Sequence, residues 1–326
     1  MKINLSSFLQ WRFNSYIFKK LGWRFTFFYL NILGKLYFFF NIKETWKIKK
    51  AVNAVFEDRK NRSEIKSIRR SVFRGILSHY YEKLFNAYCN AETLRTFVET
   101  HIESESMEAI KQGLSRGKGV LLVTGHCGGV ELIPAFLGAN NYHVTIVAKF
   151  KTEDLRNKSI RQAKKFSAKI IDADNTPNIM KAVFDHLKEN RIVITQCDEI
   201  EEWKPGRNDC ISFLGKPVLL DRTIDIIARR CGAAVVFGVM HRDYNHRYKF
   251  IATSQAEMAE KSQRYQDISI GALVLQFMEY YIYKYPEGWY QWKKYPVLDM
   301  FAPAGIRLEA PLALPVPANV LVKLHG

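Results

Sequence analysis

The core of the fold opens with Gly119-Val120-Leu121-Leu122-Val123-Thr124-Gly125, a short apolar run bounded by glycines. Its length and its branched side chains predict a buried β-strand, because such strands run for only a few residues between turn residues. Upstream of it, apolar residues recur three and four apart, so only helices are expected over roughly the first 105 residues. The chain therefore changes from helical to strand-containing structure near Gly117.

Downstream of this strand, strand-like and helix-like segments alternate. Such alternation predicts an α/β fold in which a mostly parallel central sheet is flanked by helices. Ligands bind such sheets at the carboxyl ends of the strands, and His126 follows the first core strand directly. Strands are expected at 144–150, 168–172, 191–196, 233–240 and 248–252, and helices at 154–166, at 177–187 with Thr176 as cap, at 221–232 and at 268–285.

Three regions differ in composition. Residues 1–105 are basic and aromatic, residues 106–300 carry the alternating pattern, and residues 301–326 hold four of the ten prolines and predict an extended tail. Residues 1–80 contain 17 basic and four acidic side chains, which accounts for 13 of the net charge of +17. Such a block needs a polyanionic neighbour. Its interleaved aromatic side chains favour an anionic membrane lipid surface over nucleic acid, for which the sequence has no motif.

Within the basic region, residues 25–40 carry the strongest apolar pattern. The longest uncharged run, 25–34, is about half of the roughly 20 residues that a spanning helix needs, and Lys35 follows it. We therefore expect a helix that lies in the membrane interface, with a buried helix and a single N-terminal anchor as alternatives. Its apolar residues repeat at helical spacing opposite Arg24, Asn31 and Lys35, and they are Phe25, Phe28, Ile32, Leu36, Phe39 and Phe40.

The five cysteines are scattered along the chain. Their odd number and the absence of CxxC spacing argue against a disulfide framework and against a zinc site, so no metal is expected. This usage indicates a reduced, cytosol-facing protein. Cys127 adjoins His126, and the pair leaves two interpretations open: a small apolar filler, or a nucleophile that would form an acyl-enzyme.

The stretch most suited to chemistry is Thr124-Gly125-His126-Cys127-Gly128-Gly129-Val130-Glu131. Residues five apart on one helix point about 140° apart. His126 and Glu131 can therefore meet only if the histidine lies on a turn, which the glycines permit, and Glu131 lies in the first helical turn. Glu131 would then accept the imidazole N–H and leave the other nitrogen as a base, while the start of the helix offers N–H groups to an oxyanion. The alternative is a purely structural histidine.

Three stretches together resemble a known family. His126 to Glu131 resembles the H-x4-D/E motif of the glycerolipid and lysophospholipid acyltransferase superfamily, and the glutamate is typical of its lipid A late acyltransferase branch. Phe213-Leu214-Gly215-Lys216-Pro217 is similar to that branch's F-F-G-K-P segment. Tyr285-Pro286-Glu287-Gly288-Trp289-Tyr290-Gln291-Trp292-Lys293-Lys294 is similar to its P-E-Q-W-x-W-x-x-R-R signature, and the likeness spans roughly Arg24 to Tyr295.

The resemblance implies transfer of a fatty acyl group from acyl carrier protein or acyl-CoA to a hydroxyl of a membrane lipid or glycolipid, with a lipid A-type acceptor favoured. No cofactor is implied beyond the acyl donor. His126 would be the general base, Glu131 would orient it, and no acyl-enzyme would form. The carrier protein is expected to be acidic, which suits a basic surface. The expected location is the cytoplasmic face of the bacterial inner membrane, held peripherally or by a single N-terminal anchor.

The sequence departs from the family pattern at three places. Lys149 stands where the family often has arginine, Asp198-Glu199 replaces an Asp-Gln pair, and Cys127-Gly128-Gly129-Val130 replaces F-G-N-W. These departures concern mainly the acceptor. A lysophospholipid or aminolipid acyltransferase, and an inactive membrane-docked lipid-binding protein on the same fold, therefore stay open. Trp289 and Trp292 are expected to pack. The candidate substrate-binding residues are Lys149, Asp198, Arg207, Lys216 and Arg222.

Overall fold

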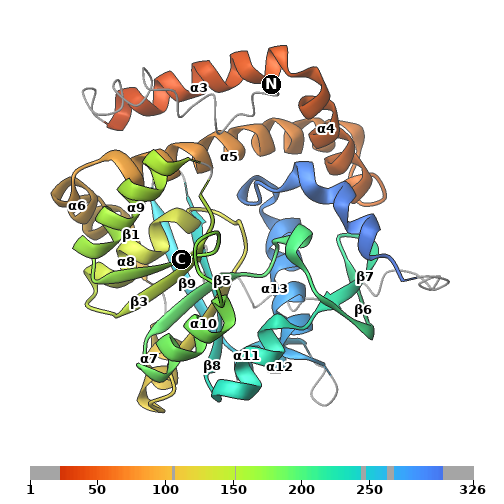
Figure 1. The fold of residues 1–326 in the computed structure, drawn as a ribbon. Coiled ribbons are helices and arrows are strands. Elements are labelled where there is room, and N and C mark those ends of the chain that lie inside the picture. Colours follow the sequence, from red (N-terminus) through yellow and green to blue (C-terminus); the bar gives the residue numbers. More distant parts are fainter. Residues whose placement is uncertain (1–22, 105–106, 151, 244–246, 263–267, 304–326) are drawn as a thin grey trace.

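The central sheet confirms the predicted α/β class. A computed structural model describes residues 23–104, 107–150, 152–243, 247–262 and 268–303 (Figure 1). Seven strands form one sheet in the order β1-β9-β8-β2-β5-β3-β4, and all neighbours are parallel except β8 and β9. The strands are β1 (Ile102–Ser104), β2 (Val120–Thr124), β3 (Val144–Ala148), β4 (Ala168–Asp172), β5 (Ile192–Gln196), β8 (Ala234–Arg242) and β9 (Tyr248–Ser254).

Helices connect the parallel strands, as the alternation predicts. The end of α11 is as expected, with Gly232 in the left-handed conformation. The start of α10 is not, because Asn178 and not Thr176 caps it by accepting the backbone N–H of Lys181. The helices of the core are α7 (Glu108–Ser115), α8 (Ile133–Ala139), α9 (Glu153–Lys165), α10 (Ile179–Lys188), α11 (Thr223–Cys231), α12 (Gln255–Ser262) and α13 (Ile270–Lys284).

The register of β2 against β5 decides which side chains meet at the end of the sheet. All five residues of β2 are buried, and the strand lies between β5 and β8. Thr124, the last residue of β2, pairs with Gln196, the last residue of β5. Two residues further along each parallel strand come His126 and Asp198, which therefore emerge side by side at the carboxyl edge.

Three strands are absent from the sequence-based prediction. β6 (Pro205–Phe213) and β7 (Lys216–Asp221) form a separate antiparallel hairpin, which turns at Leu214 and Gly215 with positive φ. The tip of this hairpin is held because Leu214 N–H donates to the carboxylate of Glu279 on α13 over 2.6 Å. β1 also escapes prediction, because it is too short to show alternation and is added to the sheet by pairing with β9.

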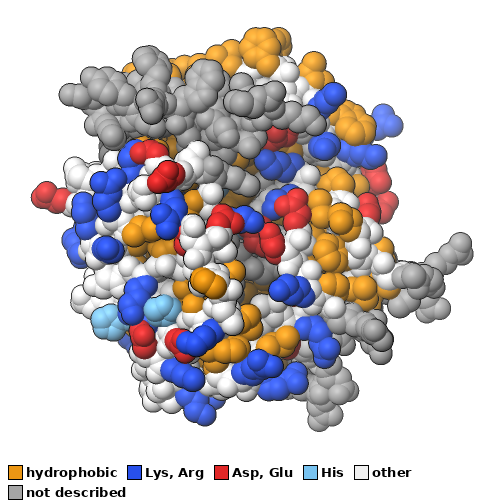
Figure 2. All heavy atoms as spheres, in the orientation of Figure 1, with side chains coloured by type: hydrophobic (Ala, Val, Ile, Leu, Met, Phe, Trp, Pro, Cys, Tyr) orange, Lys and Arg blue, Asp and Glu red, His pale blue; other side chains and the backbone are white. Residues whose placement is uncertain are grey.

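Within residues 23–104, which the structure describes, four helices precede β1, and the first of them turns its predicted apolar stripe outward. The helices are α3 (Trp23–Phe40), α4 (Ile42–Phe56), α5 (Arg62–Tyr88) and α6 (Ala91–His101). The opposite face of α3 packs on α5, where Leu30 is buried and Gly34 lies against Leu77. Figure 2 shows apolar side chains along the upper edge of the molecule, where Figure 1 places α3. The exposed stripe comprises Phe25, Phe28, Ile32, Leu36, Phe39 and Phe40.

Length and composition say little in favour of a membrane span. Among the described helices, none is by itself long and apolar enough to cross a bilayer. Residues 25–40 of α3 and α4 pass that test only together, and they are bent by 93° at the break between them. What the structure does show in this region is the exposed apolar stripe of α3.

Candidate active site

The turn after β2 is built from glycines at its tightest point. Gly128 has a φ of +57°, and a Cβ there would collide with the carbonyl oxygen of Met240. The glycines thus allow the bend that the sequence predicts. A single 3-10 turn, η1 (Val130–Leu132), follows and leads into α8. The N–H groups of the turn itself are used within the fold, because those of Cys127, Gly128 and Gly129 donate to the carbonyls of Gly125, Gly288 and Met240 respectively. An oxyanion role for the N–H groups at the start of the following helix stays a prediction.

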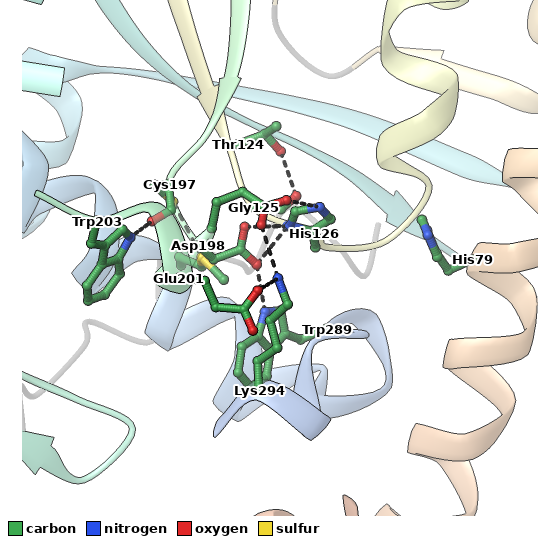
Figure 3. A network of polar contacts seen from close by, with 12 residues as sticks. His79, Thr124, Gly125, His126, Cys197, Asp198, Glu201, Trp203, Trp289 and Lys294 are labelled. Atoms are coloured by element: carbon green, nitrogen blue, oxygen red, sulfur yellow. Dashed lines mark hydrogen bonds and ion pairs between the residues drawn. The ribbon is translucent and has the colours of Figure 1, made fainter. Parts of the chain in front are cut away.

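His126 is held by the carboxylate of Asp198 (Figure 3). Nδ1 of the ring lies 2.8 Å from Oδ1, and the backbone N–H of His126 donates to both carboxylate oxygens at 3.0 Å. The indole N–H of Trp289 donates to Oδ2 at 2.8 Å. Asp198 is fully buried, so these donors replace the water that it loses. An ionised carboxylate only accepts hydrogen bonds, and Nδ1 therefore carries a proton.

The other ring nitrogen faces a second carboxylate. Oε1 of Glu199 lies 3.1 Å from Nε2 of His126, and Oε2 of Glu199 lies 3.1 Å from Nζ of Lys294. Burial alone would lower the pKa of His126, but the carboxylates of Asp198 and Glu199 outweigh it and raise that pKa to about 9. Burial opposes ionisation of Glu199, yet His126 and Lys294 lower the pKa of its carboxyl to about 2. The resting histidine is thus an imidazolium between two carboxylates.

Glu131 lies on the other side of the turn, and this corrects the geometry predicted for the H-x4-E stretch. Its carboxylate lies 3.4 Å from Nζ of Lys83 and 3.7 Å from Nε2 of His79, both on α5. Two causes act together: the ring nitrogens of His126 are engaged by the residues that follow β5, and η1 directs Glu131 toward the basic side chain of Lys83. A catalytic role for Glu131 stays a prediction, since the structure shows only where it lies.

The segment from Tyr285 to Tyr295, which we call the closing segment, packs over the turn that follows β2 and is hydrogen-bonded to it. Gly288 accepts from Gly128, and the N–H of Tyr290 donates to the carbonyl of His126. The ring of Tyr290 stacks on His79 at 3.3 Å between centroids and meets the edge of His126 at 4.8 Å. The segment includes the 3-10 turn η4 (Pro286–Gly288) and leads into η5 (Trp292–Phe301). It supplies Trp289 and Lys294 to the site.

A buried ion pair fixes the turn from the side of β8. Arg242 donates to the carbonyl of Gly128 at 2.9 Å and to both oxygens of Glu82 at 2.6 and 2.8 Å. Tyr248 on β9 donates to the same carboxylate at 2.9 Å. Because these groups are hydrogen-bonded to one another, the pair holds α5, β8, β9 and the turn in one arrangement.

Three of the remaining predicted substrate-binding residues, Lys149, Lys216 and Arg222, lie outside this cluster. Lys149 is mostly exposed and lies 3.5 Å from carboxylates of both Asp174 and Glu202, the latter in the 3-10 turn η2 (Ile200–Glu202). Lys216 lies 2.7 Å from Asp299 and over the ring of Tyr295. Arg222 is the cap residue of α11. The side chain of Arg207 lies outside the part of the chain that the structure describes.

The residues that sequence reasoning missed come from three distant segments. Glu199 was seen only as a departure from the family pattern, and Trp289 was expected to pack, which it does, but not to donate to Asp198. Lys83 and His79 carried no signal. Asp198 was predicted as a substrate-binding residue, and only its place beside His126 was missed; the signal for that place is that Asp198 follows β5 at the same distance at which His126 follows β2. Cys127 is buried, and burial raises the pKa of its thiol, which disfavours the nucleophilic thiolate.

An imidazole held by a buried carboxylate at the carboxyl ends of parallel strands suits proton transfer to and from a bound hydroxyl. The described residues hold no group of three or more histidine, cysteine or acidic side chains arranged to bind a metal.

The chain belongs to the bacterial lipid A biosynthesis acyltransferase family, whose model matches residues 9–294. The protein is therefore an acyltransferase, and the predicted family is confirmed. A search of curated proteins found none that matches this chain.

Proposed function

We propose that the protein transfers a fatty acyl group from acyl carrier protein, or from acyl-CoA, to a hydroxyl of a lipid A-type glycolipid precursor, with His126 as the general base. The observation that carries this proposal is the buried His126–Asp198 pair, 2.8 Å apart at the end of the two central strands of a chain in this family. In this proposal, Asp198 takes the positioning role that the sequence predicts for Glu131.

The chemistry follows from the tautomer that Asp198 imposes. In its neutral form the ring keeps its proton on Nδ1, so Nε2 can accept the hydroxyl proton while the hydroxyl oxygen attacks the thioester carbonyl. The imidazolium that forms is stabilised by the buried carboxylate. When the tetrahedral intermediate collapses, the C–S bond breaks and the leaving thiolate takes the proton back from Nε2. No acyl-enzyme is required.

The outward face of α3 supports docking on the cytoplasmic leaflet of the inner membrane. Phe28, Phe39 and Phe40 are 62%, 73% and 76% exposed, and the exposed Trp46 follows on α4. Lys35 on α3 and the lysines at 43, 47, 49 and 50 on α4 are exposed as well. Apolar side chains flanked by lysines are what an interfacial helix presents to anionic lipid. This face would bring the lipid acceptor and the protein to the same surface.

The proposal is tested with the purified full-length chain, acyl carrier protein loaded with a fatty acid, and acceptors in mixed vesicles. His126→Ala should abolish transfer, and Cys127→Ala should retain most of it, because no acyl-enzyme is involved. Parallel assays with a glycolipid precursor, a lysophospholipid and an aminolipid identify the acceptor. Transfer by His126→Ala at the normal rate would refute the assignment of the base, and transfer to none of these acceptors by the normal chain would refute the proposed reaction.

Membrane docking is tested separately by co-sedimentation with vesicles of phosphatidylethanolamine and phosphatidylglycerol. Replacement of Phe39 and Phe40 by serine should weaken binding severalfold, since each exposed ring contributes apolar area to the bilayer. Met300→Ser is the matched control, because Met300 is 79% exposed but lies on η5. Equal binding by the double variant and the normal chain would remove α3 as the docking face.

A further inference from the structure

The carboxylate of Glu199 lies where the acceptor hydroxyl would have to lie to give its proton to Nε2 of His126. Nδ1 of His126 is committed to Asp198, so Nε2 is the nitrogen that remains for proton transfer. Oε1 of Glu199 lies 3.1 Å from Nε2, within hydrogen-bond distance. While the carboxylate stays there, the ring holds a proton on each nitrogen and has no lone pair to offer. A hydroxyl cannot be deprotonated in this arrangement.

The carboxylate of Glu199 also has a second ion-pair partner, Lys294. Its other oxygen already lies 3.1 Å from Nζ of Lys294, and its side chain is 38% exposed, unlike that of the fully buried Asp198. Lys294 in turn lies 3.2 Å from Glu201, so the ammonium remains paired whichever way Glu199 turns. Rotation of Glu199 away from the ring therefore breaks one of its two ion pairs and keeps the other.

We propose that Glu199 is an internal competitor for Nε2 of His126, which the acceptor hydroxyl must displace before catalysis. In the resting enzyme Glu199 holds the imidazolium. When the acceptor enters, the carboxylate turns onto Lys294, the Nε2 proton leaves to water, and the neutral ring receives the hydroxyl in its place. This inference rests on the proposed role of His126 as a base.

The residue type at 199 is what makes the competition possible. The resemblance to the family leads one to expect glutamine here, and a neutral amide would not hold an imidazolium by charge. Glutamate adds a negative charge next to the ring, at a position where only a hydrogen-bonding group is needed. The enzyme is thereby kept in a protonated state until a substrate is bound.

Other charged and titratable groups lie around His126 and Glu199 and contribute to the electrostatic potential at the pair. Asp198 faces the ring from the loop after β5 and is unchanged in the Glu199 and Glu201 variants. The remaining groups are Cys127 on the turn, Glu131 on η1, His79 and Lys83 on α5, Cys197 before Asp198, Glu201 on η2, Arg242 on β8, and Tyr290 and Lys294 of the closing segment.

The test is the pH dependence of kcat/KM for Glu199→Gln. Loss of an adjacent negative charge lowers the pKa of His126, so the acid limb of the profile should move to lower pH by roughly one unit or more. Below the limb of the normal enzyme, the variant should then be about tenfold faster for each unit of displacement. Glu201→Gln is the matched control, because Glu201 pairs with Lys294 but has no contact with His126 among those described.

A second measurement does not depend on turnover. NMR titration of the isotope-labelled imidazole should show His126 losing its proton at lower pH in Glu199→Gln than in the normal protein or in Glu201→Gln. An unchanged acid limb and an unchanged titration, or the same shift in Glu201→Gln, would overturn the inference. Failure of the proposed function is recognised differently, since His126→Ala would then remain active whatever Glu199→Gln does.

Discussion

Asp198 and Glu131 flank the same turn in opposite environments. Asp198 is fully buried and accepts from His126 and Trp289, whereas Glu131 is partly exposed and faces Lys83 and His79 on α5. Glu131 is five residues from the histidine in sequence, and Asp198 is 72 residues away. Closeness within a sequence motif therefore does not ensure closeness in space. The parallel register of β2 and β5 decides closeness in space here.

The largest effect on activity is expected for Asp198→Asn. An amide that donates toward Nδ1 would favour the wrong tautomer and leave the imidazolium without its counter-charge, so kcat should fall by roughly a thousandfold or more. The measurement is kcat with acyl carrier protein as donor, with circular dichroism to show that the fold is kept. A loss smaller than that of Glu131→Gln would reverse the roles assigned to the two carboxylates.

Trp289→Phe tests the support of Asp198 with a smaller expected effect. It removes one hydrogen bond to a buried charge, which is worth about 1.5–3 kcal/mol, so kcat should fall by about tenfold to a hundredfold. Trp292→Phe is the control: Trp292 is equally buried, but its indole N–H donates to the carbonyl of Pro286. Both variants should lose stability, and only Trp289→Phe should lower kcat. Equal losses of kcat would make the effect one of packing.

Glu131→Gln should have the smallest effect of the three. The change removes an ion pair with Lys83, whose side chain is 26% exposed, and such pairs contribute about 0–1 kcal/mol. We therefore expect kcat to fall by no more than about fivefold, as measured in the same assay. Because the expected fall in kcat is small, Glu131→Asp would not be an informative control for Glu131→Gln. A loss of a hundredfold or more would show that Glu131 reaches His126 during turnover.

Much of the fold was predictable because it rests on local patterns. The glycine-bounded run before His126, each strand or helix of the alternation after it and the apolar stripe of α3 show their pattern within one short segment, and the structure confirms them. The missed elements are those whose patterns are not local. β1 is added to the sheet by β9, and the hairpin β6–β7 is shaped by its own pairing and by Glu279.

The site was predictable only in part for the same reason. His126 was found because a histidine after a buried strand is visible in sequence. The choice of Asp198 over Glu131 needs the order of the strands, which places β5 and not another strand beside β2. The part played by Trp289 needs the closing segment to lie over the turn, and nothing near Trp289 in the sequence points to Asp198.

The contacts of the closing segment affect the order in which the site can be completed during synthesis. Trp289 follows Asp198 by 91 residues, and the ring of Tyr290 reaches back to His79 in α5. Joining segments so far apart costs loop-closure entropy that no early local contact offsets. All strands of the central sheet precede Trp289 in the sequence, so Asp198 gains its indole donor only after the residues of the sheet have been synthesised. The hydrogen bonds around His126 and Asp198 are thus completed only after the strands that carry these residues.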